Sequence, residues 1–206
     1  MTIFRDRQSV GKLLANRLKT SHADLVLGIP RGGVVVAAEI AKFLKLPLNV
    51  IVTRKIGAPM QPELALGAVD PDRETVWEKH LLDDLALKTA DLREIIQNEW
   101  EEVKRREDSY RLGKKPLELK NKAVILVDDG IATGSTILAA INFLKRHQAK
   151  KIIVAVPVAS QEAAERLSGE VDEVIILETP DYFQAVGQFY QEFLPVSDQE
   201  VIQLLT

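Results

Sequence analysis

Short runs of apolar and β-branched residues recur along the chain, and most are separated by enough residues for a helix. They fall at residues 25–29, 50–53, 123–127, 152–156 and 174–177. None of the runs alternates regularly with polar residues, so each expected strand is apolar on both faces. Such strands are typical of a parallel sheet that helices cover on both sides. The pattern therefore predicts an α/β fold with a parallel sheet flanked by helices on both faces.

Three segments between or beside these runs have the periodicity of amphipathic helices. Their apolar residues recur three or four positions apart: Val10, Leu13, Leu14 and Leu18; Ala37, Ala41 and Leu44; and Ile137, Leu138, Ile141 and Leu144. A stripe of this spacing lies on one face of a helix and packs against a core. We therefore expect a helix before the first strand, one after it and one after the third.

A longer, strongly charged helix is expected in the middle of the chain. Asp91 and Glu94 form a capping-box pattern at its start, and Gly113 and Pro116 mark its end. We interpret the charged run 99–111 as a solvated face with ion pairs three or four residues apart. A ligand-binding surface is the alternative.

Composition and charge exclude several classes of protein. The 206 residues are 46 % hydrophobic and 28 % charged, which suits a globular domain with one good core. The net charge of −3 is not that of a duplex-binding domain, so no nucleic-acid partner is expected. The absence of cysteine excludes disulfides, thiolate zinc sites and cysteine nucleophiles.

Nothing in the sequence indicates export or a membrane. The first seven residues contain no apolar stretch of signal-peptide length, so we expect a cytoplasmic protein. The most apolar stretch, 152–159, is far shorter than the roughly 20 residues that span a bilayer. No membrane partner is expected.

The composition shifts after residue 179, which suggests a division into a core, 1–179, and a small C-terminal segment, 180–206. Five of the 11 aromatic residues lie between Tyr182 and Phe193. This segment contains no strand-like run. We therefore expect it to form a small appendage to the core.

The stretch that carries the chemistry is V-I-L-V-D-D-G-I-A-T-G-S-T, residues 124–136. Ligands of open α/β sheets bind beyond the carboxyl ends of the strands, which is where Asp128 and Asp129 are expected. The turn 130–136 then offers successive backbone N–H groups, hydroxyls and a helix N-terminus, which together suit a phosphate. An acidic turn that merely caps a helix is the alternative.

Common nucleotide motifs do not match this stretch. A Walker motif needs a lysine after its last glycine, whereas Ser135 follows Gly134, and the segment G-I-P-R-G-G lacks the glycine spacing of a dinucleotide fingerprint. Two acids beside a phosphate loop fit a ligand with neighbouring hydroxyls and a phosphate. Ribose 5-phosphate has that shape.

The stretch 124–136 resembles the phosphoribosylpyrophosphate-binding motif of the type I phosphoribosyltransferases. In that family the two acids hold the ribose 2- and 3-hydroxyls, so the resemblance implies this role for Asp128 and Asp129. The family's loop holds the 5-phosphate. The residues at its positions here are Ala132, Thr133, Gly134, Ser135 and Thr136.

A second match to the family is the segment G-I-P-R-G-G, residues 28–33, after the first core strand. Family members bind pyrophosphate with a short loop at this place, which implies that role for Arg31, Gly32 and Gly33. Glycines allow backbone N–H groups to approach an anion closely, and the arginine adds a fixed positive charge. The resemblance also implies a cis peptide bond before Arg31. Taken alone, the segment could be a plain turn.

The family closes a flexible loop over pyrophosphate after the second strand. Here the segment 53–59 contains Arg54, Lys55, glycine and proline, which suggests a mobile basic loop. The resemblance implies pyrophosphate contacts for the two cations and a catalytic role for Glu63. Ordinary surface charges are the alternative.

A C-terminal hood covers the base in the family, and residues 180–206 fit its place. Tyr182 and Phe183 are therefore candidates for stacking on a base, with the alternative that these rings form the hood's own core. In relatives that use 6-oxopurines, the position of Ala132 typically carries an acid. The alanine predicts that hypoxanthine and guanine are poor substrates.

The resemblance implies an enzyme that transfers phosphoribose from phosphoribosylpyrophosphate to a nitrogenous base and releases pyrophosphate. Asp128, Asp129, Arg31 and Glu63 are its expected catalytic residues. Mg²⁺ is the expected cofactor, bound mainly through the substrate, and a homodimer is expected from the family. The alternatives are a regulator that keeps the fold as a ligand sensor and a receiver-like phosphate-binding module.

Overall fold

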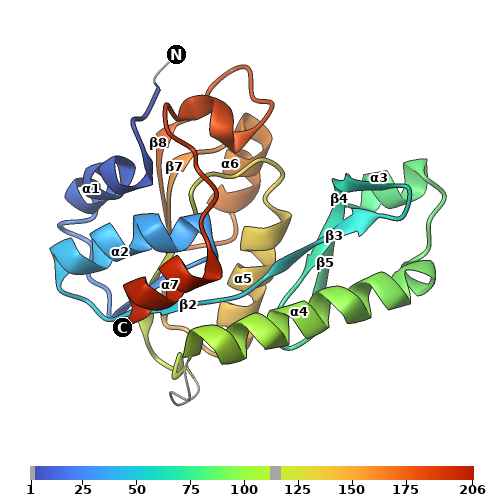
Figure 1. Cartoon of the computed structure of the whole chain (residues 1–206), viewed down its shortest axis with the longest axis horizontal. Coiled ribbons are helices and arrows are strands. Elements are labelled where there is room, and N and C mark those ends of the chain that lie inside the picture. Colours follow the sequence, from blue (N-terminus) through green and yellow to red (C-terminus); the bar gives the residue numbers. More distant parts are fainter. Residues whose placement is uncertain (1–2, 112–116) are drawn as a thin grey trace.

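Five parallel strands form the larger of two sheets in the computed structural model, which describes residues 3–111 and 117–206 (Figure 1). The strand order is β2-β1-β6-β7-β8, and every neighbouring pair is parallel. The strands are β1 (Leu25–Gly28), β2 (Leu48–Val50), β6 (Ala123–Val127), β7 (Lys151–Val158) and β8 (Glu173–Glu178). The predicted α/β fold with a parallel sheet is confirmed.

Helices cover both faces of this sheet, as β1 illustrates. Leu25 and Leu27 pack in the core beneath α5 (Ser135–Arg146) and α6 (Gln161–Ser168). Val26, between them, packs in the opposite core beneath α1 (Arg7–Arg17) and α2 (Gly32–Leu44). Successive side chains of a strand point to opposite faces, so a run that is apolar throughout fills both cores.

The second strand begins and ends earlier than the predicted run 50–53. β2 pairs with β1 only from Leu48 to Val50, where Val50 lies opposite Gly28. β1 ends at Gly28, so there is no further strand for residues 51–53 to pair with. Strand length is therefore set by the neighbour rather than by the apolar run itself.

A three-stranded antiparallel sheet follows where the sequence predicts a mobile loop. Its strands are β3 (Arg54–Ala58), β4 (Gln61–Val69) and β5 (Thr75–Trp77). Ile56 and Leu66 are fully buried in cores that include residues of the next helices. The pairing of β3 with β4 is irregular around Gly57, so the alternation that reveals a strand is interrupted there. The glycine and proline that suggested a loop lie at this irregularity and in the turn after β3.

The smaller sheet and a long helix extend to one side of the parallel sheet. α3 (Lys79–Asp84) follows β5, and α4 (Arg93–Arg111) runs from the end of the small sheet back towards the larger one (Figure 1). The predicted capping box at Asp91 is wrong. Asp91 lies in the 3-10 turn η1 (Thr89–Leu92), and its carboxylate accepts a hydrogen bond from the Lys88 N–H. The predicted helix end at Gly113 and Pro116 lies outside the described residues.

The C-terminal segment contributes to the main core. It contains the 3-10 turn η2 (Val186–Phe189) and the helix α7 (Asp198–Leu205). Phe189 and Tyr190 are buried in the core beneath α1 and α2, and Tyr190 forms a parallel bridge with Phe4. In the described part of the chain, no helix has the length and apolarity needed to cross a membrane.

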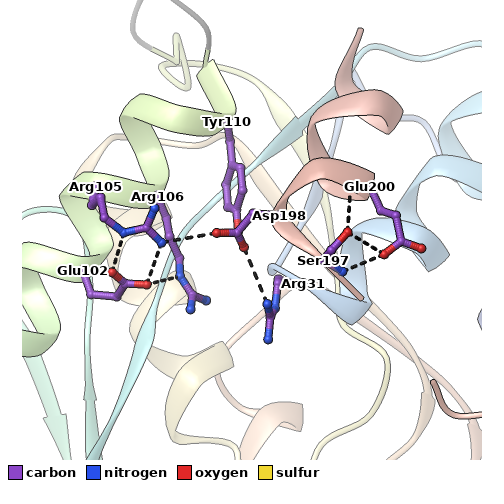
Figure 2. Close-up of polar contacts among 8 residues, drawn as sticks. All are labelled: Arg31, Glu102, Arg105, Arg106, Tyr110, Ser197, Asp198 and Glu200. Carbon is purple, nitrogen blue, oxygen red and sulfur yellow. Dashed lines mark hydrogen bonds and ion pairs between the residues drawn. The ribbon is translucent and has the colours of Figure 1, made fainter. Parts of the chain in front are cut away.

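Polar contacts attach α7 to α4 (Figure 2). Asp198 accepts hydrogen bonds from the Tyr110 hydroxyl at 2.7 Å and from Arg105 at 3.2 Å. Glu102 pairs with Arg105 and Arg106, three and four residues further along α4. The predicted spacing of the ion pairs is thus confirmed for these residues, but Glu102 and Arg106 are partly buried, so they do not form a solvated face.

We predict that Glu102→Gln weakens the acid sensitivity of folding. The hydrogen bond from Arg105 is the largest cause that lowers the pKa of Glu102 from 4.5 to about 2. A carboxylate whose pKa is lowered by folding stabilises the protein above its unfolded pKa, and this contribution disappears as the pH falls through the folded value. The free energy of unfolding of the variant should therefore fall less steeply than that of the wild type between about pH 5 and about pH 2.

Urea unfolding at a series of pH values measures this slope. The matched control is Glu101→Gln, an exposed change on the same helix, which should keep the wild-type slope. Equal slopes for Glu102→Gln and the wild type would contradict the prediction.

Candidate active site

The two motifs singled out in the sequence meet at one edge of the parallel sheet. β1 and β6 are neighbours, with Gly28 opposite Val127, and the Ile29 N–H donates to the Val127 carbonyl at 2.9 Å. The segment 28–33 and the acidic pair both follow these strand ends. The carboxyl edge of a parallel sheet is the usual ligand site of α/β folds.

The glycines after Arg31 allow the acidic pair to lie directly against the loop. A β-carbon on Gly32 would come within 1.8 Å of the Asp129 Oδ2 atom. One on Gly33 would come within 2.9 Å of the Asp128 Cα atom and of the Val127 carbonyl oxygen. The sequence predicts that these glycines allow an anion to approach the backbone. In the structure they also leave room for the two acids to pack against the loop. The peptide bond between Pro30 and Arg31 is cis, as expected.

Both acids are held by contacts within the chain. The Asp128 Oδ1 atom accepts a hydrogen bond from the Asp129 N–H at 2.8 Å. Asp129 Oδ2 accepts one from Arg7 Nε at 2.7 Å, and its backbone carbonyl accepts one from the Tyr190 hydroxyl at 2.6 Å. Burial, followed by the negative charge of Asp129, raises the pKa of Asp128 well above its ordinary value.

Two helices begin at this edge without a capping side chain. The N-cap of α2 is Arg31 and that of α5 is Gly134, and neither helix has a side-chain hydrogen bond at its cap within the described residues. In contrast, Asp6, Ser160 and Ser197 cap α1, α6 and α7. Uncapped N–H groups and the positive end of the helix dipole favour an anion.

The phosphate loop contacts the buried carboxylate of an ion pair whose arginine is partly exposed. The hydroxyl of Ser135 is buried and donates to Glu78 Oε1 at 2.5 Å, and Glu78 pairs with Arg166 at 2.6 Å. Thr133 is exposed, and its hydroxyl lies 3.1 Å from that of Ser135. The Ser135 side chain therefore faces the protein interior, and only its backbone N–H remains for a ligand.

A cavity of about 420 Å³ borders the phosphate loop. The loop, the β3–β4 hairpin, α3 and the C-terminal segment all contribute to its wall. The lining residues are Gly130, Ile131, Ala132, Thr133, Gly134, Ser135, Thr136, Lys55, Glu63, Leu64, Ala65, Leu81, Gln184 and Val186. All five residues of the predicted phosphate loop thus contribute to the lining of one cavity.

The two predicted cations of the hairpin have different partners. Lys55 lines the cavity, and its Nζ lies 3.1 Å from a carboxylate oxygen of Glu63. Arg54 does not line this cavity, and its Nε donates to Glu99 of α4 at 2.7 Å. Arg54 and Lys55 do line a second cavity together with Glu63 and Glu99. Lys55 and Glu63 are brought to the phosphate loop, whereas Arg54 is not.

The cavity lining does not include the remaining predicted site residues, which are Asp128, Asp129, Arg31, Gly32, Gly33, Tyr182 and Phe183. The guanidinium of Arg31 is 3.8 Å from the Asp198 carboxylate of α7 (Figure 2). The ring of Phe183 packs on Phe189 at 5.1 Å, and Tyr182 is exposed. Gln184 and Val186 are the residues of the C-terminal segment that line the cavity.

Four residues that contact the site were not predicted from the sequence: Arg7, Glu78, Arg166 and Tyr190. Arg7 lies 122 residues before Asp129, and Glu78 lies 88 residues before Arg166. No local motif connects residues so far apart. Only Tyr190 had a signal, because it belongs to the aromatic-rich segment after residue 180.

Comparisons with known proteins identify the family of this arrangement. The family model described as "Phosphoribosyl transferase domain" matches residues 5–192. A protein of Mycobacterium tuberculosis, named provisionally as a phosphoribosyl transferase, is 42 % identical over 207 residues. That match covers 100 % of this chain and 47 % of the relative, so the chain spans about half the length of this curated relative.

Solved structures have the same fold. The protein TT1426 from Thermus thermophilus is 40 % identical, with a TM-score of 0.81 over 99 % of this chain and 98 % of that one. A purine phosphoribosyltransferase from Pyrococcus horikoshii is 18 % identical, with a TM-score of 0.52 over 95 % of this chain and 97 % of that one. At this identity the second likeness concerns the fold alone.

We predict that Ser135→Ala destabilises the protein more than Thr133→Ala. The first change removes a buried hydrogen bond to a charged carboxylate, which is worth about 1.5 to 3 kcal/mol. The second removes an exposed hydroxyl and should change the free energy of unfolding by less than about 0.5 kcal/mol. Urea unfolding of the two variants measures the difference, and equal stability would show that the Glu78 contact is not stabilising.

Proposed function

The chain belongs to the type I phosphoribosyltransferase family, and we propose that it transfers phosphoribose from phosphoribosylpyrophosphate to a nitrogenous base. The observation that carries this proposal is the meeting of two carboxylates with two uncapped helix N-termini at one sheet edge. Carboxylates suit sugar hydroxyls, and helix N-termini suit phosphate groups. The two kinds of group match the two ends of a sugar phosphate.

Each part of the ligand has a proposed partner. Asp128 and Asp129 accept hydrogen bonds from the ribose 2- and 3-hydroxyls. The 5-phosphate binds at the N-terminus of α5, in the loop from Ala132 to Thr136. Pyrophosphate binds at the N-terminus of α2, near Gly32 and Gly33.

Three cations are proposed to contact pyrophosphate: Arg31, Arg54 and Lys55. Their positions in the structure support this role to different degrees. Lys55 faces the phosphate-loop cavity. Arg31 and Arg54 are paired with Asp198 and Glu99 in this structure, so both would have to exchange a carboxylate for a phosphate oxygen.

The proposed reaction breaks the bond between the anomeric carbon and pyrophosphate, whose oxygen keeps the electron pair. A lone pair of the base nitrogen forms the new bond to the same carbon, and the base loses a proton. Positive charge develops on the ribose and negative charge on pyrophosphate. The carboxylates favour the first and the α2 N-terminus with Arg31 favours the second.

Mg²⁺ is the proposed cofactor and is bound mainly through the substrate. No group of three or more His, Cys, Asp or Glu side chains gathers as a metal site in the described residues. Mg²⁺ commonly uses one or two protein carboxylates and several substrate oxygens. The carboxylates of Asp128 and Asp129 fit an ion that the substrate carries. When bound, the ion would neutralise charge on the leaving pyrophosphate.

The cavity beside the phosphate loop is the proposed base site. Gln184 and Val186 of the segment 180–206, the proposed hood, line it together with Glu63. Tyr182 and Phe183 stay candidates for stacking on a base only if the hood rearranges. Glu63, ion-paired with Lys55, is the proposed acceptor of the base proton.

The wider proposals follow from the same family. We propose a role in nucleotide salvage, in the cytoplasm, by a homodimer whose subunits each consist of a core, 1–179, and a hood, 180–206. Phosphoribosylpyrophosphate and one base are its proposed ligands.

Asp128→Asn and Asp129→Asn should each weaken the use of phosphoribosylpyrophosphate. A hydrogen bond to a carboxylate is worth about 1.5 to 3 kcal/mol, so we expect a loss of roughly tenfold to 150-fold in kcat/KM. Base-dependent release of pyrophosphate in the presence of Mg²⁺ is the measurement.

The same assay separates an enzyme from a sensor. Calorimetric binding of phosphoribosylpyrophosphate without pyrophosphate release with any base would favour the regulator. A double variant, Asp128→Asn with Asp129→Asn, that forms nucleotide at the wild-type rate would overturn the proposed roles of the acids.

The alanine at position 132 determines our expectation for the base. An acid that can exchange a proton with a 6-oxopurine is missing there, so hypoxanthine and guanine should react more slowly than another base. Initial rates with a panel of purines and pyrimidines, at saturating phosphoribosylpyrophosphate and Mg²⁺, test this expectation. Fastest turnover with guanine or hypoxanthine would contradict it.

A further inference from the structure

Arg7 reaches the acidic motif from the N-terminal helix. It is the first residue of α1, and its Nε donates to Asp129 Oδ2 at 2.7 Å. Only 11 % of the Arg7 side chain and 16 % of the Asp129 side chain are exposed. We propose that Arg7 is a positioning residue that orients the Asp129 carboxylate for the ribose hydroxyls, an inference that rests on the proposed function.

The guanidinium is fixed by contacts with the C-terminal segment as well. Arg7 Nη1 donates to the Leu194 carbonyl at 2.8 Å, and the guanidinium carbon lies 3.9 Å from the centre of the Phe193 ring. Contact with the face of an aromatic ring stabilises a cation in addition to its hydrogen bonds. Arg7 therefore has one preferred geometry, set by residues distant in sequence.

The backbone of Asp129 is fixed by the same segment. The Tyr190 hydroxyl donates to the Asp129 carbonyl at 2.6 Å. The ring of Tyr190 lies 5.0 Å from that of Phe193, so the residues that hold the Asp129 backbone and the Arg7 side chain pack together. Backbone and carboxylate are thus oriented by one structural unit.

Contacts within the chain occupy one oxygen of each acid. Asp129 Oδ2 accepts a hydrogen bond from Arg7, and Asp128 Oδ1 accepts one from the Asp129 N–H. The two side chains also interact with each other, which contributes to the raised pKa of Asp128. A carboxylate oxygen can accept a sugar hydroxyl, so we assign the two neighbouring hydroxyls to the other oxygens, Asp129 Oδ1 and Asp128 Oδ2.

The positive charge of Arg7 also stabilises the two adjacent acids in their charged form. Two adjacent carboxylates at a half-buried strand end repel each other, and a nearby cation offsets that repulsion. Arg7 opposes the burial and the Asp129 charge that raise the pKa of Asp128. Both geometry and charge therefore point to the same role.

A latch that blocks the site until substrate arrives is the other way to interpret an arginine on this carboxylate. A latch must leave, but removing this guanidinium would leave a largely buried carboxylate without its partner. A β-carbon at Gly32 would also lie within 2.7 Å of Arg7 Nε, so the pair rests directly on the loop backbone. The burial and the number of contacts favour a permanent position.

The test compares two sugar phosphates in the full chain with Mg²⁺. Calorimetry gives the affinities for ribose 5-phosphate and for 2,3-dideoxyribose 5-phosphate, which lacks both hydroxyls. The wild type should prefer ribose 5-phosphate by about tenfold or more. The ratio of the two affinities, ribose 5-phosphate over the dideoxy compound, measures this preference. Arg7→Met should reduce the ratio at least about fivefold while changing the affinity for the dideoxy compound by less than about twofold.

Two further variants complete the comparison. Arg17→Met, the same change at an exposed position of α1, should keep the wild-type ratio. Arg7→Lys keeps the charge but loses the planar guanidinium, so its ratio should lie between those of the wild type and Arg7→Met. If Arg7→Met does not fold, the ratio of Arg7→Lys is decisive, and a wild-type ratio in that variant overturns the inference.

The outcomes separate this inference from the proposed function. A wild type that binds neither sugar phosphate overturns both. A wild type that discriminates, with Arg7→Met discriminating equally well, overturns the positioning role alone. An equal loss of affinity for both compounds in Arg7→Met shows a purely structural role and also overturns it.

Discussion

The backbone at Gly32 has no room for a β-carbon, and the arrangement of the site depends on this constraint. The Asp129 carboxylate and the Arg7 guanidinium lie against that backbone, and Gly33 packs closely on Asp128, although less tightly. A side chain at either glycine would separate the loop after β1 from the acids after β6. The two motifs can share one sheet edge only because both contact residues lack side chains.

A second set of contacts joins the small antiparallel sheet to the phosphate loop. Glu78 follows β5, Ser135 begins α5, and Arg166 belongs to α6, so one cluster connects three elements. Glu78 is buried, and a buried carboxylate that loses its partners is unfavourable. The cluster therefore fixes the loop relative to the hairpin that carries Lys55 and Glu63 across the cavity.

The C-terminal segment is held on two sides. Tyr190 and Phe193 contact Arg7 and Asp129, while Asp198 at the start of α7 contacts Tyr110 of α4 and approaches Arg31. The segment thus touches both the acidic motif and the arginine of the neighbouring loop. The segment therefore contacts a residue that is proposed to bind the ribose and a residue that is proposed to bind the pyrophosphate.

Local sequence patterns were enough to predict the parallel sheet, the acidic motif and the glycine-rich loop. Apolar runs such as 123–127 and the D-D-G-I-A-T-G-S-T stretch are local patterns, in which neighbouring residues carry the signal. Parallel pairing of β1 with β6 then follows from general rules for α/β folds. That is why the placement of Asp128 and Asp129 at a sheet edge could be predicted.

The side chains that meet at this edge could not be predicted in the same way, because their contacts depend on packing between distant elements. The pairing of Arg7 with Asp129 and of Glu78 with Arg166 joins residues 122 and 88 positions apart, and no periodicity links them. The inward turn of Ser135 and the different partners of Arg54 and Lys55 depend on which neighbours packing places beside them. Local patterns record which face of an element is buried, whereas contacts between distant charged residues are set by packing, which brings their elements together only after the chain has folded.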